Sequence, residues 1–241
     1  PLIFLIYRSV PFVTGSESAK KDIVKYGIPE ENITVIPHGV IVSSKFKVQG
    51  SKLLKKSKVK NIVYLGVLSR DKGIEDALNC FSILSNRGKF NFWVIGKPEN
   101  NNYKEKMDEL IRKFSLEKKV KFWGYVNQER KFELLSKAQI LVNPSVREGW
   151  GLVNIEANAV GTPVVAYNVA GIVDSVKNGV SGIICKRNNA KELAENVDRL
   201  LNDERLYKKL QTGSLSWSKQ FSWDRSRKLS LSLIRRLSNA H

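Results

Sequence analysis

At 241 residues, with 42% hydrophobic and 27% charged side chains, the chain is long enough for one substantial core and some additional segments. Its 41 lysines and arginines outnumber 23 acidic residues. The resulting formal charge of +18 draws anionic partners: nucleic acid, phosphorylated small molecules or an acidic membrane surface. No apolar run is long enough for a membrane-spanning helix. Cys80 and Cys185 show neither metal-binding nor redox spacing, so we expect two buried thiols and a cytoplasmic protein.

The N-terminal part of the chain predicts a short strand, a helix and a second strand. Residues 12–27 have the pattern of strand, turn and helix, with Ser16 as the N-cap and Gly27 as the C-terminal stop. Residues 31–40 predict another strand that ends in a loop. Residues 43–60 are strongly basic and have little core pattern, which is typical of a linker.

From residue 61 onward, short apolar runs alternate with amphipathic helical patterns. The predicted strands are residues 61–66, 91–96, 120–124, 139–144, 164–167 and 181–185. Strands that are apolar throughout and joined by helices indicate a parallel sheet covered on both faces. We therefore expect an α/β fold, a Rossmann-like doubly wound domain that binds ligands at the carboxyl ends of its strands.

Residues 143–165, NPSVREGWGLVNIEANAVGTPVV, carry the main functional signal. Glu148 lies in a Gly-Trp-Gly loop, and Glu156 follows after seven intervening residues on a short helical run that ends at Gly161. This layout suits a sugar nucleotide, because one carboxylate can hold sugar hydroxyls, the other the ribose, and backbone amides the charged linkage. Two such acids alone are more often solvent-exposed; the glycines and flanking strands favour the site.

Two further loops have the chemistry of a nucleotide site. Lys72 lies at the start of a predicted helix, where amide donors and the helix dipole favour a phosphate; a solvated lysine is the ordinary alternative. Gly124 permits close approach of a ligand, and the amide and carbonyl of Val126 can read a base edge; a simple turn is the alternative there. We expect a structural role for His38.

These motifs together resemble the family-4 retaining glycosyltransferases. Residues 143–165 match the pattern "PSxxEGfGlvxxEAxAxGtPVV" at nearly every position. Residues 16–40 resemble the end of that family's N-domain, residues 64–73 the start of its second domain, and residues 221–224 the entry to its C-terminal helix. Because the opening residues read as the middle of a domain, we expect the chain to be part of a longer protein.

The resemblance implies a GT-B architecture of two Rossmann-like domains. Its "glycosyl transferases group 1" C-terminal domain, which binds the donor, would occupy residues 61–215, preceded by a linker at 43–60. Residues 1–42 would be a remnant of the acceptor-side N-domain, and residues 216–241 a C-terminal helix that crosses back toward it.

The resemblance also implies an activity and a role for each site residue. The enzyme would transfer a sugar from a nucleoside-diphosphate sugar to a glycan or lipid-linked saccharide, with retention of anomeric configuration. Glu148 would contact the sugar near the reacting carbon and Lys72 the diphosphate, so these are the candidate catalytic residues; Glu156 would accept from ribose hydroxyls. The other candidate donor contacts are Gly66, Arg70, Gly124, Val126, Gly149, Trp150, Gly151, Leu152 and Val153.

One departure from the family pattern concerns charge. Val67 stands where the family usually has an arginine, and losing one charged contact costs about 1.5–3 kcal/mol. Arg70 in the same loop is a candidate replacement; a charge-deficient, weak or inactive site is the competing interpretation. The sequence has no D-x-D motif and no His/Cys cluster, so we expect no cofactor and no metal, as is typical of GT-B enzymes.

Two alternatives remain at this stage. A GT-B relative that binds sugar nucleotides without catalysis is compatible with Val67. A nucleic-acid-binding protein is compatible with the charge of +18, but the basic residues are scattered and no nucleic-acid fold signature is present, so we expect no nucleic-acid partner. Contact with an anionic membrane face accounts for the charge better.

Overall fold

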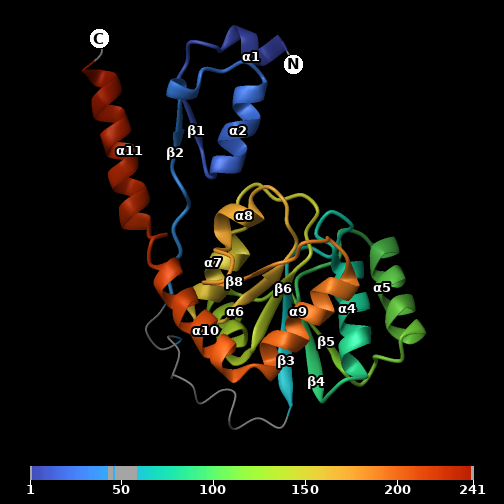
Figure 1. Ribbon diagram of the computed structural model, residues 1–241. Helices are drawn as coiled ribbons and strands as arrows, with labels where there is room; N and C mark the ends of the chain where they lie inside the picture. Colours follow the sequence, from blue (N-terminus) through green and yellow to red (C-terminus); the bar gives the residue numbers. More distant parts are fainter. Residues whose placement is uncertain (1, 43–45, 47–58, 240–241) are drawn as a thin grey trace.

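The computed structural model describes residues 2–42, 46 and 59–239, so most of the predicted linker at 43–60 lies outside the described residues. Its main feature is a six-stranded sheet with the order β5-β4-β3-β6-β7-β8 (Figure 1). The strands are β3 (Lys60–Leu65), β4 (Phe90–Ile95), β5 (Val120–Gly124), β6 (Ile140–Asn143), β7 (Val164–Ala166) and β8 (Gly182–Ile184). All five pairings are parallel, which confirms the predicted α/β doubly wound fold.

Helices cover both faces of this sheet because successive side chains of a strand point to opposite faces. In β3, Ile62 and Tyr64 join the core that contains α4, α5 and α9, whereas Val63 joins the core that contains α6 and α7. The helices are α4 (Ile74–Ser85), α5 (Asn101–Lys113), α6 (Gln128–Lys137), α7 (Leu152–Ala159), α8 (Ile172–Ser175), α9 (Ala190–Asn202), α10 (Glu204–Ser218) and α11 (Trp223–Ser238). Both cysteines are buried and free, as predicted.

The strand order fixes where ligands bind. The chain builds β3, β4 and β5 outward in one direction and then returns to place β6 on the other side of β3. The direction of winding therefore reverses between β3 and β6, and doubly wound sheets bind ligands at the carboxyl edge of such a switch point. The loops that leave β3 and β6 at this edge contain Lys72 and Glu148.

The N-terminal segment forms a small separate unit, with helix α1 (Leu2–Ile6), strand β1 (Phe12–Thr14), helix α2 (Glu17–Lys25), a 3-10 turn (Glu30–Asn32) and strand β2 (Ile33–Val35). β1 and β2 pair in parallel. The Ser16 hydroxyl accepts from the Ala19 N–H at 3.1 Å, which confirms the predicted N-cap, and Gly27 has a left-handed φ of 92° just past the helix end.

The C-terminal helix runs from the larger unit alongside this small one (Figure 1). The Ser226 hydroxyl donates to the Pro37 carbonyl at 2.5 Å, and the Val40 N–H donates to the Phe221 carbonyl at 3.0 Å. The predicted boundary at 215/216 falls inside α10, and the next helix, α11, begins at Trp223. In the described part of the chain, no helix combines the length and apolar character needed to cross a membrane.

Candidate active site

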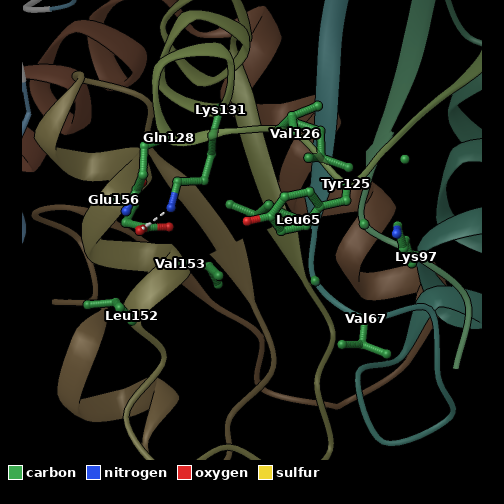
Figure 2. A pocket seen from close by; sticks show the side chains of 14 residues that line it. Leu65, Val67, Lys97, Tyr125, Val126, Gln128, Lys131, Leu152, Val153 and Glu156 are labelled. Carbon is green, nitrogen blue, oxygen red and sulfur yellow. Dashed lines mark hydrogen bonds and ion pairs between the residues drawn. The ribbon is translucent and has the colours of Figure 1, made fainter.

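A cavity of about 460 Å³ opens at the carboxyl ends of β3, β4 and β5, beside α6 and α7 (Figure 2). Six of the predicted binding residues line it: Gly66, Gly124, Val126, Leu152, Val153 and Glu156. The structure thus brings together residues from three separate segments of the sequence. The remaining lining residues are Leu65, Val67, Ile95, Gly96, Lys97, Tyr125, Gln128 and Lys131.

Glycines form part of the cavity wall at the ends of β3, β4 and β5. Gly96 has a φ of +142°, and a Cβ added to it would lie only 1.8 Å from the Gly66 carbonyl oxygen. The ends of β3 and β4 therefore approach each other more closely than any side chain would allow. Gly124, with a φ of +64°, has no atom within 4 Å of an added Cβ, so it leaves open space at the end of β5.

Glu156 is an acid in the cavity wall that already has a cation beside it. It lies on α7 and is only 6% exposed, and Lys131 on α6 donates to its Oε1 at 2.5 Å. Burial raises the pKa of the Glu156 carboxyl, and the hydrogen bond and charge of Lys131 oppose that rise. Within the described residues nothing donates to Oε2, so one oxygen is left for a hydroxyl of a ligand.

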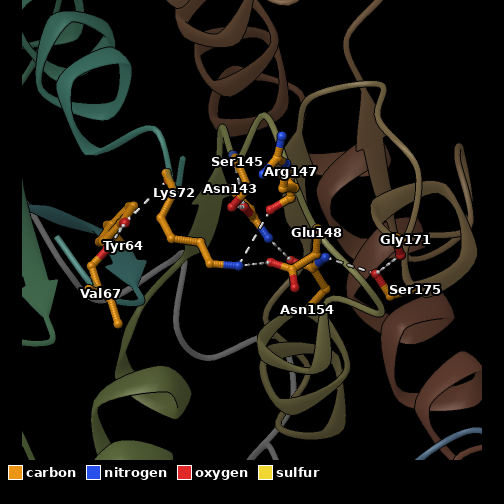
Figure 3. A network of polar contacts seen from close by, with 10 residues as sticks. All are labelled: Tyr64, Val67, Lys72, Asn143, Ser145, Arg147, Glu148, Asn154, Gly171 and Ser175. Carbon is orange, nitrogen blue, oxygen red and sulfur yellow. Dashed lines mark hydrogen bonds and ion pairs between the residues drawn. The ribbon is translucent and has the colours of Figure 1, made fainter. Parts of the chain in front are cut away.

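Lys72 and Glu148 form a second pair at the switch point (Figure 3). Lys72 Nζ lies 2.8 Å from Glu148 Oε2 and 3.5 Å from the Arg147 carbonyl oxygen. The two side chains are 33% and 17% exposed, so the pair is partly open to solvent. The buried Tyr64 hydroxyl holds the β3–α4 loop in place through hydrogen bonds to the carbonyls of Val67 (2.8 Å) and Lys72 (3.2 Å).

The loop that contains Glu148 is fixed by a buried polar network (Figure 3). The Asn143 amide donates to Asn154 Oδ1 at 2.8 Å, and the Asn154 amide donates to Ser175 Oγ at 2.9 Å. Gly171 packs directly beneath the loop, since a Cβ there would lie 2.3 Å from the Glu148 carbonyl oxygen. Sequence reasoning missed this network, although polar residues within otherwise apolar runs, such as Asn143 and Asn154, were a usable signal.

Two helix N-termini face the same edge of the sheet. Gly73 caps α4 and Gly151 caps α7, both in the left-handed region, with φ of 68° and 75°. Neither helix start receives a side-chain cap. Each therefore offers unsatisfied N–H groups and the positive end of its dipole to an anion at this edge.

The structure places six predicted residues outside the cavity lining: Arg70, Lys72, Glu148, Gly149, Trp150 and Gly151. Trp150 points into a small core against Ile155 and Phe221, so only its backbone remains available to a ligand. The Gly149 carbonyl accepts a hydrogen bond of 2.7 Å from the Ser16 hydroxyl, which connects the small N-terminal unit to the Glu148 loop. Arg70 is exposed, on the loop between β3 and α4.

Several lining residues were not among the predicted contacts: Lys97, Tyr125, Gln128 and Lys131. A lysine on an amphipathic helix is usually a solvated residue, so nothing in the local pattern distinguished Lys131. In the part of the chain that the structure describes, no group of three or more His, Cys, Asp and Glu side chains has the arrangement of a metal site.

The model of one protein family, described as "Glycosyl transferases group 1", matches residues 46–216. The chain belongs to this family. This confirms the group 1 resemblance, and the residues matched include both candidate loops and the cavity.

Relatives of this group 1 member support the same assignment. It is similar to the capsular polysaccharide biosynthesis glycosyltransferase CapM of Staphylococcus aureus, with 34% identity over 211 residues, 83% of this chain and 54% of CapM. An uncharacterized glycosyltransferase of Methanocaldococcus jannaschii, MJ1607, is 30% identical over 206 residues, 82% of this chain and 52% of that protein. The chain therefore spans about half the length of these curated relatives.

Solved structures share the fold of this group 1 member. Anabaena HepE in complex with UDP and glucose matches 99% of this chain and 66% of its own, with a TM-score of 0.81 and 18% identity. A glycosyltransferase from Rickettsia africae matches 97% of this chain and 66% of its own, with a TM-score of 0.83 and 24% identity. The predicted GT-B relationship of the fold is thereby confirmed.

Proposed function

We propose that this chain forms the donor-binding part of a family-4 glycosyltransferase, which transfers a sugar from a nucleoside-diphosphate sugar with retention of anomeric configuration. The observation that carries the proposal is the position of Glu156 in the wall of a 460 Å³ cavity at the switch point of the sheet. Glu148 and Lys72 lie at the same edge, on the two loops that leave β3 and β6.

The cavity wall supplies the groups that a nucleoside requires. Its open end at Gly124 admits the base, whose edge meets the backbone amide and carbonyl of Val126. The free oxygen of Glu156 accepts from the ribose hydroxyls, while the hydrogen bond and charge of Lys131 oppose the rise in the pKa of this buried acid.

The start of α7 and Lys72 act on the diphosphate. In the transfer, the bond between the anomeric carbon and the diphosphate breaks, and negative charge develops on the leaving group. The amides at the start of α7, where Leu152 and Val153 line the cavity, and the ammonium group of Lys72 stabilise that charge, each charged contact contributing about 1.5–3 kcal/mol. Glu148 holds the sugar beside Lys72. On this proposal neither a metal nor a cofactor is required for the step.

The acceptor is proposed from fewer observations than the donor site. Two observations favour a glycan or lipid-linked saccharide at the cytoplasmic face of an anionic membrane: the similarity to CapM, whose name refers to capsular polysaccharide biosynthesis, and the charge of +18. The absence of a nucleic-acid partner stays a prediction from sequence.

A sugar-nucleotide-binding protein without catalysis is the second candidate, because Val67 lines the cavity and offers no charge there. Turnover of a nucleotide sugar by the full-length protein decides between the two. Donor binding with no transfer or hydrolysis would favour the second candidate.

Thermal unfolding of the chain in the presence of UDP, GDP and ADP tests the donor site. A nucleotide at about 100 times its Kd stabilises the fold by about 2.7 kcal/mol, a Tm increase of roughly 5–11 °C for a chain of this size. We expect an increase with one of the three, and its loss in Glu156→Ala. The control is Glu109→Ala, which removes an exposed acid of α5 outside the cavity. An unchanged Tm with all three nucleotides, or an increase that survives Glu156→Ala, would contradict the proposal.

A further inference from the structure

One of the charged side chains that line the cavity has no partner of opposite charge among the described residues. Three of its lining residues are charged: Lys97, Lys131 and Glu156. Lys131 is neutralised by Glu156, and just outside the lining Lys72 is neutralised by Glu148. Among the described residues, Lys97 has no acidic partner within ion-pair distance. It is therefore the cation of the cavity that has a net charge to offer an anionic ligand.

Backbone contacts fix Lys97 beside the loop that leaves β3. The Leu68 N–H donates to the Lys97 carbonyl at 2.9 Å, and the Glu99 N–H donates to the Leu68 carbonyl at 3.1 Å. This short parallel bridge between Leu68 and Pro98 continues the pairing of β3 with β4 beyond their ends. Lys97 and Val67 consequently lie on the same side of the cavity (Figure 2).

The side chain of Lys97 also has a partner at the cavity mouth. Its Nζ lies 5.8 Å from the centroid of the Tyr125 ring, and Tyr125 is itself a lining residue. A cation over the face of an aromatic ring is attracted to it, so this contact favours a position of the ammonium group at the cavity. Lys97 and Val67 are both exposed, but Val67 is apolar.

Other unpaired cations of the neighbouring loops are less suitably placed. Arg70 is exposed and is not a lining residue of the cavity. Arg147 precedes Glu148, but Figure 3 shows its guanidinium group pointing away from the pair of Lys72 and Glu148. The hypothesis that Arg70 replaces the missing charge at position 67 is therefore less favoured than a role for Lys97.

We infer that Lys97 binds the diphosphate of the donor and provides, from the end of β4, the positive charge that Val67 does not provide from the end of β3. This inference rests on the proposed donor site and assigns it one further ligand-binding residue. A single free ammonium group that contacts a phosphate oxygen has a large effect on the affinity for a diphosphate and a small one on the affinity for the nucleoside.

Isothermal titration of the full chain with UDP, GDP and ADP, and with uridine, guanosine and adenosine in the same series, tests the inference. We expect Lys97→Ala to weaken the preferred diphosphate roughly 10- to 150-fold and to leave its nucleoside within about twofold. Lys97→Arg should keep most of the affinity. The matched control is Lys113→Ala, because Lys113 also lies over an aromatic ring, 6.0 Å from that of Phe114, but outside the cavity.

A second substitution tests the position as well as the charge. Since residues 67 and 97 line the same side of the cavity, Val67→Arg introduced into Lys97→Ala should restore much of the lost diphosphate affinity. Equal affinities in Lys97→Ala and Lys113→Ala, or equal losses for diphosphate and nucleoside, would overturn the inference while leaving the donor site intact. A wild-type chain that binds none of the three diphosphates would overturn the donor site itself, and with it the role of Lys97.

Discussion

Replacing Lys131 by methionine tests how much the ion pair between Lys131 and Glu156 in the cavity wall contributes to the stability of the fold. The substitution keeps the volume of the side chain but leaves Glu156 without its cation. The two side chains are 16% and 7% exposed and their charged atoms lie 2.5 Å apart, so this is a largely buried pair. Breaking such a pair by removing one partner costs about 3–5 kcal/mol, because the other charge stays buried and unpaired. We expect about 3 kcal/mol, the low end of that range, because the pair borders an open cavity.

The loss of stability should depend on pH in a definite direction. Burial raises the pKa of Glu156 and Lys131 opposes the rise, so in Lys131→Met the folded-state pKa rises further. A carboxyl group with a raised folded-state pKa stabilises the fold at pH values below its unfolded pKa, and this contribution is lost as the pH rises through the folded-state pKa. The deficit of Lys131→Met is therefore larger at about pH 8 than at about pH 5.

Urea denaturation of the ligand-free chain at the two pH values measures this deficit. The control is Lys137→Met on the same helix, since Lys137 pairs with Glu133 at 2.6 Å but is 57% exposed; such surface pairs contribute about 0–1 kcal/mol. The double variant Lys131→Met with Glu156→Gln should recover part of the loss, because no buried charge remains. If Lys131→Met and Lys137→Met lose the same small amount at both pH values, the electrostatic account of the cavity wall is wrong.

The central strands of the sheet were predictable from the sequence because they are buried on both faces. Runs such as residues 61–66 and 139–144 are mainly apolar and short, and they correspond to β3 and β6. Within residues 31–40, predicted as a strand that ends in a loop, the strand spans Ile33–Val35 and the loop follows. Pro37 has no N–H to donate to a sheet, and the Val40 N–H pairs with Phe221 instead, a contact with a distant segment that no local pattern reveals.

The candidate site was predictable only in part, because sequence spacing identifies acids but not their partners. The loop glycines around Glu148 and the seven-residue spacing to Glu156 were visible in the sequence. Lys131 was not, since it lies on a different helix, 25 residues before Glu156, and only the packing of α6 against α7 brings the two together. For Arg70, the sequence placed the residue in the β3–α4 loop without showing that it lies outside the cavity lining.

Two further predictions concern the loop that holds Glu148. Trp150 is 9% exposed and its ring meets that of Phe221 at 5.1 Å, so Trp150→Ala should cost about 3–5 kcal/mol in urea denaturation; a loss below about 1 kcal/mol would mean that this small core does not hold the loop. Gly151→Ala should lower the Tm by several degrees, a cost of about 1–3 kcal/mol. Its φ is +75°, and the added Cβ would lie 2.5 Å from Ser175 Oγ. Gly149→Ala two residues earlier is the matched control, because its Cβ would meet no atom within 4 Å and its φ is not in the left-handed region. Equal Tm values for the two alanine variants would show that the left-handed start of α7 is not what fixes the position of Glu148.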